Sequence, residues 1–534
     1  GGGEAPGAEQ PPGSNDPAWR AARLRRVDIL ADRLGMADQA EALVREALGP
    51  DGVDVELLDR LARVLKRAQD RPGLEAVLER LVRIEPPAAS AERWIDLARL
   101  ARWRGDAAAA IERFARAAAA SLDAPSVVPL LREYALREVP AGEATQVLKD
   151  VAFRAPPSAA GAAAMLRLLV ARLMASQGRM VEAEGEVRTA VETLPDDVEA
   201  RLLLAQVSGD SDEVRDSLLA ALRLDPFRPE ILAGLVKGLG RDARTAELRS
   251  CAAQVLVAFG QADGETLALA GQLRAPSGEK SLSREQMLRW IVHPAEPRLA
   301  LDLLAAAGPK LGGMYPQPEF GAVEPIPRGT LAGQEVASVA SLFGVERFEA
   351  CFAQHPQVSV ALVLDERPRV IVGPRASAAG AAALRFHLGR AFVLLATGGA
   401  IVSLLPPAEI RRLVEGLVGQ QVPDYGDPAM VQRIGRTLGW GARRGLVAQA
   451  REYASAGPFD LSGWQAAAAL TANRGGLLAC ADFAAARIEV HALSGIPAPH
   501  PSSPDSWEAS RLVPAMADLL RYAVGTDYVA ARAR

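Results

Sequence analysis

Two short segments in the C-terminal third of the chain carry the residue types best suited to chemistry. Residues 385–390 read RFHLGR, and residues 471–477 read TANRGGL. If the two segments meet at a pocket, the guanidinium groups of Arg385, Arg390 and Arg474 would favour a carboxylate or a phosphate. The alternative is that these arginines form ion pairs with nearby acidic side chains and hold no ligand.

The histidines do not predict a metal centre. The chain has five histidines, and no two of them lie three or four residues apart, the spacing that places two ligands on one face of a helix. One helical turn from His387 lie Ala383, Leu384 and Ala391, none of which can bind a metal. We therefore expect neither a metal nor another cofactor. The acidic residues Asp482 and Glu489 are expected on the solvated edge of a helix.

Cysteine usage and charge indicate the compartment and exclude one class of partner. Cys251, Cys351 and Cys480 are far apart and form no C-x-x-C pair, which is typical of buried free thiols in a reducing compartment. The net charge is −4 and the basic residues are dispersed, so no nucleic-acid partner is expected. Cytoplasmic localisation is the expectation, although a start at Gly-Gly-Gly without Met leaves room for a lost upstream signal or domain.

The longest apolar stretch, residues 391–405, does not predict a transmembrane segment. It is about 15 residues long and contains Gly398 and Gly399, whereas a spanning helix needs roughly 20. We expect a buried helix that breaks at these glycines.

The first half of the chain, residues 18–275, repeats a helical pattern. Small and large apolar residues recur so that one stripe of a first helix faces one stripe of a second, and a glycine permits the turn between them. One copy contains Trp94, Leu97, Ala98, Gly105, Ala110, Phe114 and Ala117, and another contains Ala171, Gly178, Ala183, Ala190 and Pro195. Proline at Pro195 and Pro226 ends second helices.

This pattern resembles the tetratricopeptide repeat (TPR), with six to eight hairpins in the chain. The resemblance implies an α-solenoid, whose concave groove recognises an extended or helical segment of another protein. Arg99, Arg102 and Arg132 lie on first helices and are candidate contacts in that groove.

The remaining residues divide into a tail, a connector and a second domain. Residues 1–17 are expected to be a disordered tail, and residues 276–334, rich in proline and glycine, an irregular linker or strap. The runs at 358–364 and 369–372 are rich in β-branched residues and predict a β-hairpin, after which helical patterns follow, among them one over 462–486. The predicted fold class is therefore mainly α: an α-solenoid followed, over residues 335–534, by a mostly helical α+β domain with a small hairpin or sheet.

The order of strand, RFHLGR helix and later TANRGGL helix resembles gluzincin metallopeptidases of the HtpX and CAAX-prenyl-protease type. In that family, the first helix carries two zinc-binding His with a catalytic Glu between them, and a later helix carries a Glu ligand and an Asp. In this chain, Phe386 stands at the first His position, His387 at the catalytic Glu and Arg390 at the second His. Ala469 stands at the position of the Glu ligand, and Asn473 at that of the Asp. The resemblance thus implies a pseudopeptidase domain without zinc ligands.

These patterns together predict a non-catalytic scaffold or adaptor. The TPR groove would bind a partner protein, and the C-terminal domain would be a second docking module or a homodimer interface, for example through helices within residues 464–486. The alternative is an enzyme of metal-independent chemistry that uses the remnant pocket around His387. A pseudo-domain should bury Phe386 and leave His387 exposed or structurally bonded, whereas an enzyme should place His387 in a cleft with a titratable partner.

Overall fold

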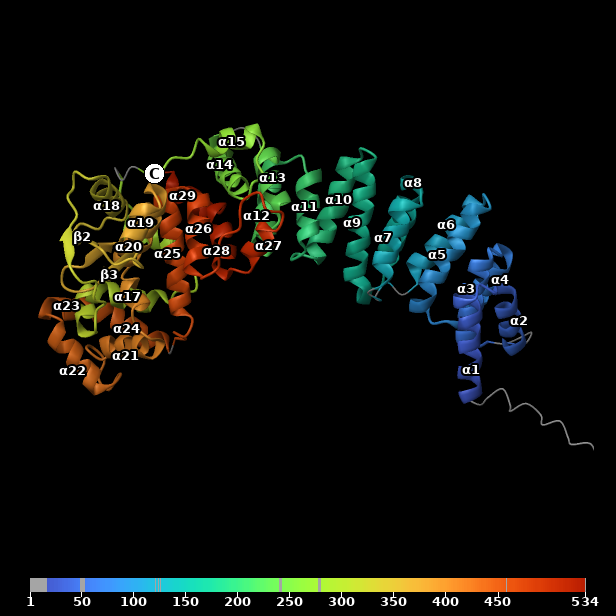
Figure 1. The fold of residues 1–534 in the computed structure, drawn as a ribbon, viewed down its shortest axis with the longest axis horizontal. Helices are drawn as coiled ribbons and strands as arrows, with labels where there is room; N and C mark the ends of the chain where they lie inside the picture. Colours follow the sequence, from blue (N-terminus) through green and yellow to red (C-terminus); the bar gives the residue numbers. More distant parts are fainter. Residues whose placement is uncertain are drawn as a thin grey trace, which may run out of the picture. The chain divides into compact units, whose positions relative to one another are not determined.

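The computed structural model describes residues 17–48, 53–120, 122, 124, 126–239, 243–276, 280–457 and 459–533 (Figure 1). The predicted tail, residues 1–17, lies outside this range except for its last residue. The chain forms two compact units, one ending at Gly209 and the other spanning Asp210–Arg534. Each unit is described by itself.

The first unit consists of successive antiparallel helical hairpins, as the repeat pattern predicts. Its elements are α1 (Pro17–Asp28) with the π-helical turn η1 (Ile29–Arg33), α2 (Ala37–Leu48), α3 (Val55–Ala68), α4 (Arg71–Ile84), α5 (Pro87–Trp103), α6 (Ala107–Ala119), α7 (Val127–Arg137), α8 (Ala141–Arg154), the 3₁₀ turn η2 (Pro157–Ala159), α9 (Ala160–Ser176), α10 (Met180–Thr193) and α11 (Val198–Val207). Neighbours such as α5 and α6, or α9 and α10, pack against each other along their lengths.

The residues at the repeat positions form the core of these hairpins. Nine of the predicted positions carry apolar side chains that pack in the core. Trp94 is half-buried, and the other eight are buried: Leu97, Ala98, Ala110, Phe114, Ala117, Ala171, Ala183 and Ala190. Gly105 and Gly178 form the turns between paired helices, with φ angles of +84° and +77°. Residues that have a Cβ atom rarely adopt such positive φ angles. Pro195 follows the end of α10.

The second unit begins with four further helices, α12 (Ser211–Leu224), α13 (Pro229–Gly238), α14 (Ala243–Ala258) and α15 (Gly264–Ala270). Pro226 lies between α12 and α13. The helices that follow are α16 (Arg284–Trp290), α17 (Arg298–Ala307), η3 (Pro309–Met314), α18 (Leu331–Leu342), α19 (Pro374–Ala378), α20 (Ala381–Thr397), η4 (Gly399–Ser403), α21 (Pro407–Val418), α22 (Pro428–Thr437), α23 (Trp440–Gly445), α24 (Val447–Ala456), α25 (Trp464–Cys480), α26 (Phe483–Leu493), α27 (Ser506–Arg511), α28 (Pro514–Ala523) and α29 (Thr526–Arg532).

A four-stranded sheet lies within the second unit, in the order β1-β2-β4-β3. The predicted hairpin is present as β3 (Val360–Val363) antiparallel to β4 (Arg369–Val372), with Val360 opposite Val372. Two strands were not predicted: β2 (Glu349–Ala353) pairs parallel to β4, and β1 (Val323–Pro325) pairs antiparallel to β2. Strand β3 therefore forms one edge of the sheet.

Residues 276–334 are more regular than predicted. Within the described part of this segment lie α16, α17, η3, β1 and the start of α18. One face of α17 is buried, including Leu301 and Leu304. The apolar residues of this short helix recur on one face and anchor the segment in the core. The prolines and glycines on either side of the helix had suggested an irregular segment.

The domain boundary expected near residue 275 falls inside the second unit. The side chain of Gln254 in α14 donates a hydrogen bond to the carbonyl oxygen of Ala481 (2.8 Å), and Arg487 donates to that of Ala258 (3.2 Å). Phe259 stacks on Trp507 with ring centroids 3.8 Å apart. The last repeat-like helices thus share a core with the C-terminal helices.

Helices α20 and α25 cross closely at the centre of the second unit, where they meet at glycines. A Cβ on Gly389 would lie 2.5 Å from the carbonyl oxygen of Gly475, so only glycine lets the two backbones approach this far. Helix α20 ends at Thr397 before Gly398 with φ +91°, which confirms the predicted break. The predicted helix over 462–486 is instead two helices, because Ala481 adopts a left-handed conformation (φ +49°) between α25 and α26.

The burial of α25 also corrects the predicted dimer interface. Most of its residues are buried against the other helices of the same unit, from Trp464 at its start to Cys480 at its end. Little of this helix is left on the surface for a second copy of the chain.

One stretch of the described residues, Pro157–Ser176, is long and apolar enough to cross a membrane. Over an 18-residue part of this stretch, 56% of the residues are buried inside the protein. Helices α8, α10 and α11 cover it, as they would the central helix of a helical-repeat core.

Candidate functional site

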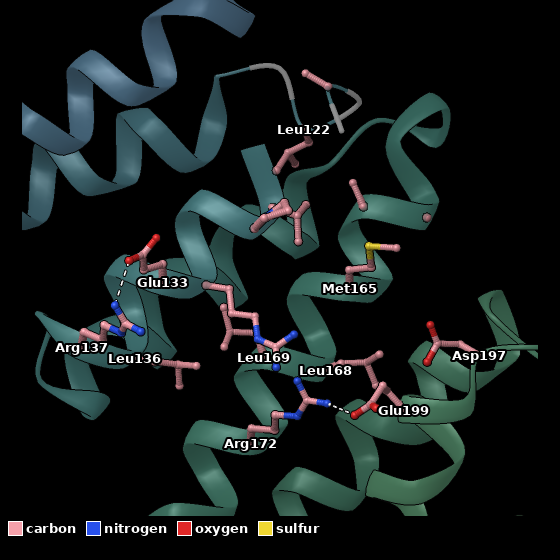
Figure 2. Close-up of a pocket in the computed structure, with 16 residues that line it drawn as sticks. Leu122, Glu133, Leu136, Arg137, Met165, Leu168, Leu169, Arg172, Asp197 and Glu199 are labelled. Carbon is pink, nitrogen blue, oxygen red and sulfur yellow. Dashed lines mark hydrogen bonds and ion pairs between the residues drawn. The ribbon is translucent and has the colours of Figure 1, made fainter. Parts of the chain in front are cut away.

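One cavity lies on the first helices of consecutive hairpins in the first unit. It has a volume of about 900 Å³ and is lined by α7, α9, the start of α11 and residues 122 and 124 (Figure 2). We call it the solenoid pocket. First helices line the groove in repeats of this type, so the cavity lies where the repeat pattern predicts binding.

The walls of the solenoid pocket are largely apolar and partly exposed. Leu136 on α7 and Met165 on α9 are 49% and 46% exposed, and Leu168 and Leu169 lie beside them (Figure 2). Large apolar side chains gathered in one concavity are a feature of sites that bind another molecule.

Two of the three arginines of the solenoid pocket form ion pairs, and the third does not. Arg172 forms an ion pair with Glu199 at 2.9 Å, and Arg137 pairs with Glu133 at 3.0 Å. Arg132 is exposed and, within the described residues, has neither a hydrogen bond nor an ion pair. Burial lowers the pKa of Arg172, and the positive charge of Arg132 lowers it further. The pocket therefore holds one guanidinium without a counter-ion.

The two other candidate groove contacts are already occupied. Arg99 donates to both carboxylate oxygens of Glu138 and also pairs with Asp96, and Arg102 pairs with Glu143 at 3.0 Å. The hydrogen bonds to Glu138 raise the pKa of Arg99. These two arginines join neighbouring helices, which leaves Arg132 as the available contact.

The RFHLGR and TANRGGL segments come together in the second unit on the crossing helices α20 and α25. Phe386 is fully buried at this crossing, and Ala469 is exposed. Asn473 is buried, and its side-chain oxygen has no hydrogen-bond partner among the described residues. The segments meet, as the predicted pocket requires, but most of their side chains pack instead of facing a cavity.

Two of the three arginines predicted to surround a ligand are structural. Arg385 is buried and donates to Glu335 (2.6 Å) and to the carbonyl oxygens of Ala479 (2.7 Å) and Pro276 (2.8 Å). Arg474 donates to both carboxylate oxygens of Asp518, with its Nε at 2.9 Å. These two residues follow the alternative expectation of pairing with acidic side chains.

The third arginine lines a cavity together with His387. This cavity, which we call the His387 pocket, has a volume of about 420 Å³ and lies between the edge strand β3 and helices α20, α25 and α26. Arg390 has neither a hydrogen bond nor an ion pair within the described part of the chain. Its guanidinium carbon lies 5.8 Å from the centroid of the Phe386 ring. Burial lowers the pKa of Arg390 to about 10.

His387 is paired with an acidic residue that was expected in solvent. Its Nε2 lies 2.8 Å from Oε2 of Glu489, and both side chains are buried. The hydrogen bond from His387 lowers the pKa of Glu489, against an opposing effect of burial. An ionised Glu489 can accept a hydrogen bond from an N–H at Nε2 of His387.

The expectation of a solvated Glu489 was wrong, and a signal in the sequence could have found it. Glu489 lies three residues after Ala486 and one before Val490, both buried, so it belongs to the apolar face of α26. Asp482, its supposed companion, accepts a hydrogen bond from the backbone N–H of Ala485 and caps the same helix.

The proposed criterion for a pseudo-domain does not separate the two functional alternatives. Phe386 is buried in the core, as a pseudo-domain requires, while His387 lines a cavity with a titratable partner, as an enzyme requires. Across the described residues, no three His, Cys, Asp or Glu side chains gather as metal ligands would. The arrangement can hold a proton between His387 and Glu489 and can offer a cation, Arg390, to a ligand.

Comparisons with known proteins found similar solved structures of helical-repeat proteins but no match to a protein family or to a curated sequence. One similar structure is the C-terminal part of a TPR repeat-containing protein from Cytophaga hutchinsonii, with 10% identity, a TM-score of 0.30, and coverage of 46% of this chain and 98% of that one. Another is the TPR2AB domain of yeast Sti1 in its pHSP90 complex, with 13% identity, a TM-score of 0.20, and coverage of 48% and 90%.

A third similar structure, that of Naa15/Naa10 bound to HypK-THB, covers 89% of this chain and 63% of its own at 14% identity and a TM-score of 0.26. At these identities and scores, the comparisons carry no argument about activity or partners. The chain is a mainly α-helical protein with TPR-like hairpins and a small four-stranded sheet in its C-terminal part.

Proposed function

We propose that this chain is a non-catalytic scaffold that binds a segment of a partner protein in the solenoid pocket. The observation that carries the proposal is the combination of exposed apolar side chains, Leu136 and Met165, with the unpaired guanidinium of Arg132 in one cavity. The segment that fits would insert an apolar side chain between α7 and α9 and place a carboxylate near Arg132.

The C-terminal α+β region is, in this proposal, a second docking module of pseudopeptidase type. Its support is that the two remnant segments lie on helices that cross each other, with Gly389 at the contact. The similar solved structures do not add to this part of the proposal. Cytoplasmic localisation and the absence of nucleic-acid partners are further parts of the same proposal, the localisation resting on three buried free cysteines.

A crosslinking experiment tests the binding at the solenoid pocket. A photoreactive benzoylphenylalanine at Leu136 is compared with one at Val181, which is 84% exposed on α10 outside the pocket. We expect a protein that is crosslinked from position 136 and not from position 181. Its affinity, measured with the purified partner, should fall about tenfold in Arg132→Glu, which is roughly 1.4 kcal/mol. Equal crosslinking from both positions would contradict the proposal.

A metal-independent enzyme is the second candidate, favoured by the buried pair of His387 and Glu489 at the edge of a cavity. A proton shared between a histidine and a carboxylate beside a cavity is an arrangement used in general acid–base catalysis. The test is whether a ligand that binds in this pocket is chemically converted. Conversion would favour the enzyme, and binding without conversion would favour the scaffold.

A further inference from the structure

We propose that the His387 pocket binds a small organic oxyanion, a carboxylate or phosphate attached to an apolar body, with Arg390 as its counter-ion. This inference is independent of the protein binding proposed for the solenoid pocket, since the two cavities lie in different units of the chain.

The size and lining of the cavity suit a small amphipathic molecule. A volume of about 420 Å³ falls within the range of roughly 300–1,000 Å³ of small-molecule sites. The apolar walls come from four elements: β3, α20, η4 with the residue after it, and α26. They include Val360, Leu362, Leu394, Leu404 and Leu493. An inorganic ion alone would leave these apolar walls without contact.

Arg390 supplies the charge complementarity. The other two arginines of the paired segments, Arg385 and Arg474, are satisfied by carboxylates, whereas Arg390 lines the cavity with no counter-ion in the described residues. A half-buried guanidinium without a partner costs free energy, which an oxyanion recovers by accepting two hydrogen bonds from its planar fork.

The other charged groups of the cavity support an anion and disfavour a cation. Arg375 also lines the pocket, and the one carboxylate there, Glu489, is engaged by His387. The cavity is therefore lined by two guanidinium groups and by one carboxylate that already has a hydrogen-bond partner. A metal ion would meet net positive charge, and an anion would meet attraction.

Calorimetric titration of the purified full chain tests the inference with four probes: octanoate, octyl phosphate, inorganic phosphate and the uncharged 1-octanol. We expect octanoate or octyl phosphate to bind at least tenfold more tightly than 1-octanol and inorganic phosphate. The comparison of octanoate with octyl phosphate identifies the head group. If neither amphipathic anion binds at millimolar concentration, or if 1-octanol binds as tightly as both, the inference is wrong.

Variants localise the binding. Arg390→Gln should weaken the binding of the amphipathic anion at least tenfold and Arg390→Lys less, while Arg451→Gln, which removes an exposed arginine on α24 outside the pocket, should leave it unchanged. Equal affinities of Arg390→Gln and wild type would overturn the assignment, and so would an equal loss in Arg451→Gln.

A second variant keeps the test open if Arg390→Gln does not fold. Val360→Phe narrows the cavity from the edge strand while Arg390 stays in place. It should weaken the binding of octanoate and octyl phosphate. Unchanged affinity for both anions in a folded Val360→Phe protein would place their binding elsewhere and contradict the inference.

Discussion

The Nε2 atom of His387 and the Oε2 atom of Glu489 lie 2.8 Å apart, although 102 residues separate them in the chain. This buried pair joins α20 to α26, the two helices that form one side of the His387 pocket. Since the hydrogen bond from His387 lowers the pKa of Glu489, the pair contributes to stability, and this contribution depends on pH.

We expect Glu489→Gln to lower the free energy of unfolding at pH 7 by about 1–3 kcal/mol, because the change weakens a buried charge-assisted hydrogen bond. The folded-state pKa of Glu489 is depressed, so its contribution is present above the pKa of the unfolded state and is lost as the pH falls through the folded-state value. The difference between wild type and variant should therefore shrink below about pH 4. Urea unfolding from pH 7 to pH 3.5 measures it, with the exposed Glu452→Gln as the control. A difference that grows in acid would contradict the assignment.

Gly389→Ala should destabilise the second unit by roughly 1–3 kcal/mol or more, because the added Cβ meets backbone atoms of α25 that cannot move aside. Thermal unfolding followed by circular dichroism measures the effect. In the matched control, Gly441→Ala in α23, the Cβ meets no atom within 4 Å. Helix propensity alone then predicts a neutral or slightly stabilising change. Equal effects of the two substitutions would show that the crossing is looser than described.

Arg385 and Glu335 should be strongly coupled. Each single change, Arg385→Met or Glu335→Gln, leaves a buried or half-buried polar group without its partner, and we expect a loss of about 3–5 kcal/mol for Arg385→Met. The double variant should cost less than the sum of the two single variants. A double-mutant cycle in urea gives the coupling energy, and a value near zero would mean that the ion pair adds nothing beyond the bonds of Arg385 to Ala479 and Pro276.

The three thiols should be unreactive in the folded protein. Burial raises the pKa of Cys251 and of Cys480 to about 12, and it also raises the pKa of Cys351. Few thiolates are then present at pH 8, and the thiolate is the reactive species. Ellman's reagent should react slowly with the native chain at pH 8 and rapidly with three thiols in guanidinium chloride. A fast-reacting thiol in the native chain would assign that cysteine to the surface.

Local patterns predicted the local structure well. The repeat positions around Phe114 are buried, the hairpin of β3 and β4 is present, and the apolar stretch after Ala391 breaks at Gly398. Each of these features depends on residues that are close in the sequence, separated by one or two helical turns or lying on adjacent strands. Periodicity and turn chemistry act over that distance.

The features that were missed depend on contacts between distant residues. Strand β2 is short and carries no alternating pattern of its own, and it is stabilised by parallel pairing with β4. The partner of Arg385 is Glu335, 50 residues away, and nothing in the spacing of charges identifies it. The place of Glu489 on the apolar face of α26 could have predicted its burial, but its partner His387 lies 102 residues away in the chain.

Helical-repeat proteins commonly diverge by gaining or losing whole hairpins, because each hairpin contacts only its neighbours. The hairpin of α13 and α14 is not exchangeable in this way, since Gln254 and Phe259 belong to the same core as Ala481 and Trp507. A duplication or deletion after Asp210 would disrupt that core, whereas one between α3 and α10 would join like surfaces. Homologous chains should therefore differ in hairpin number before residue 210 and keep it constant after that point.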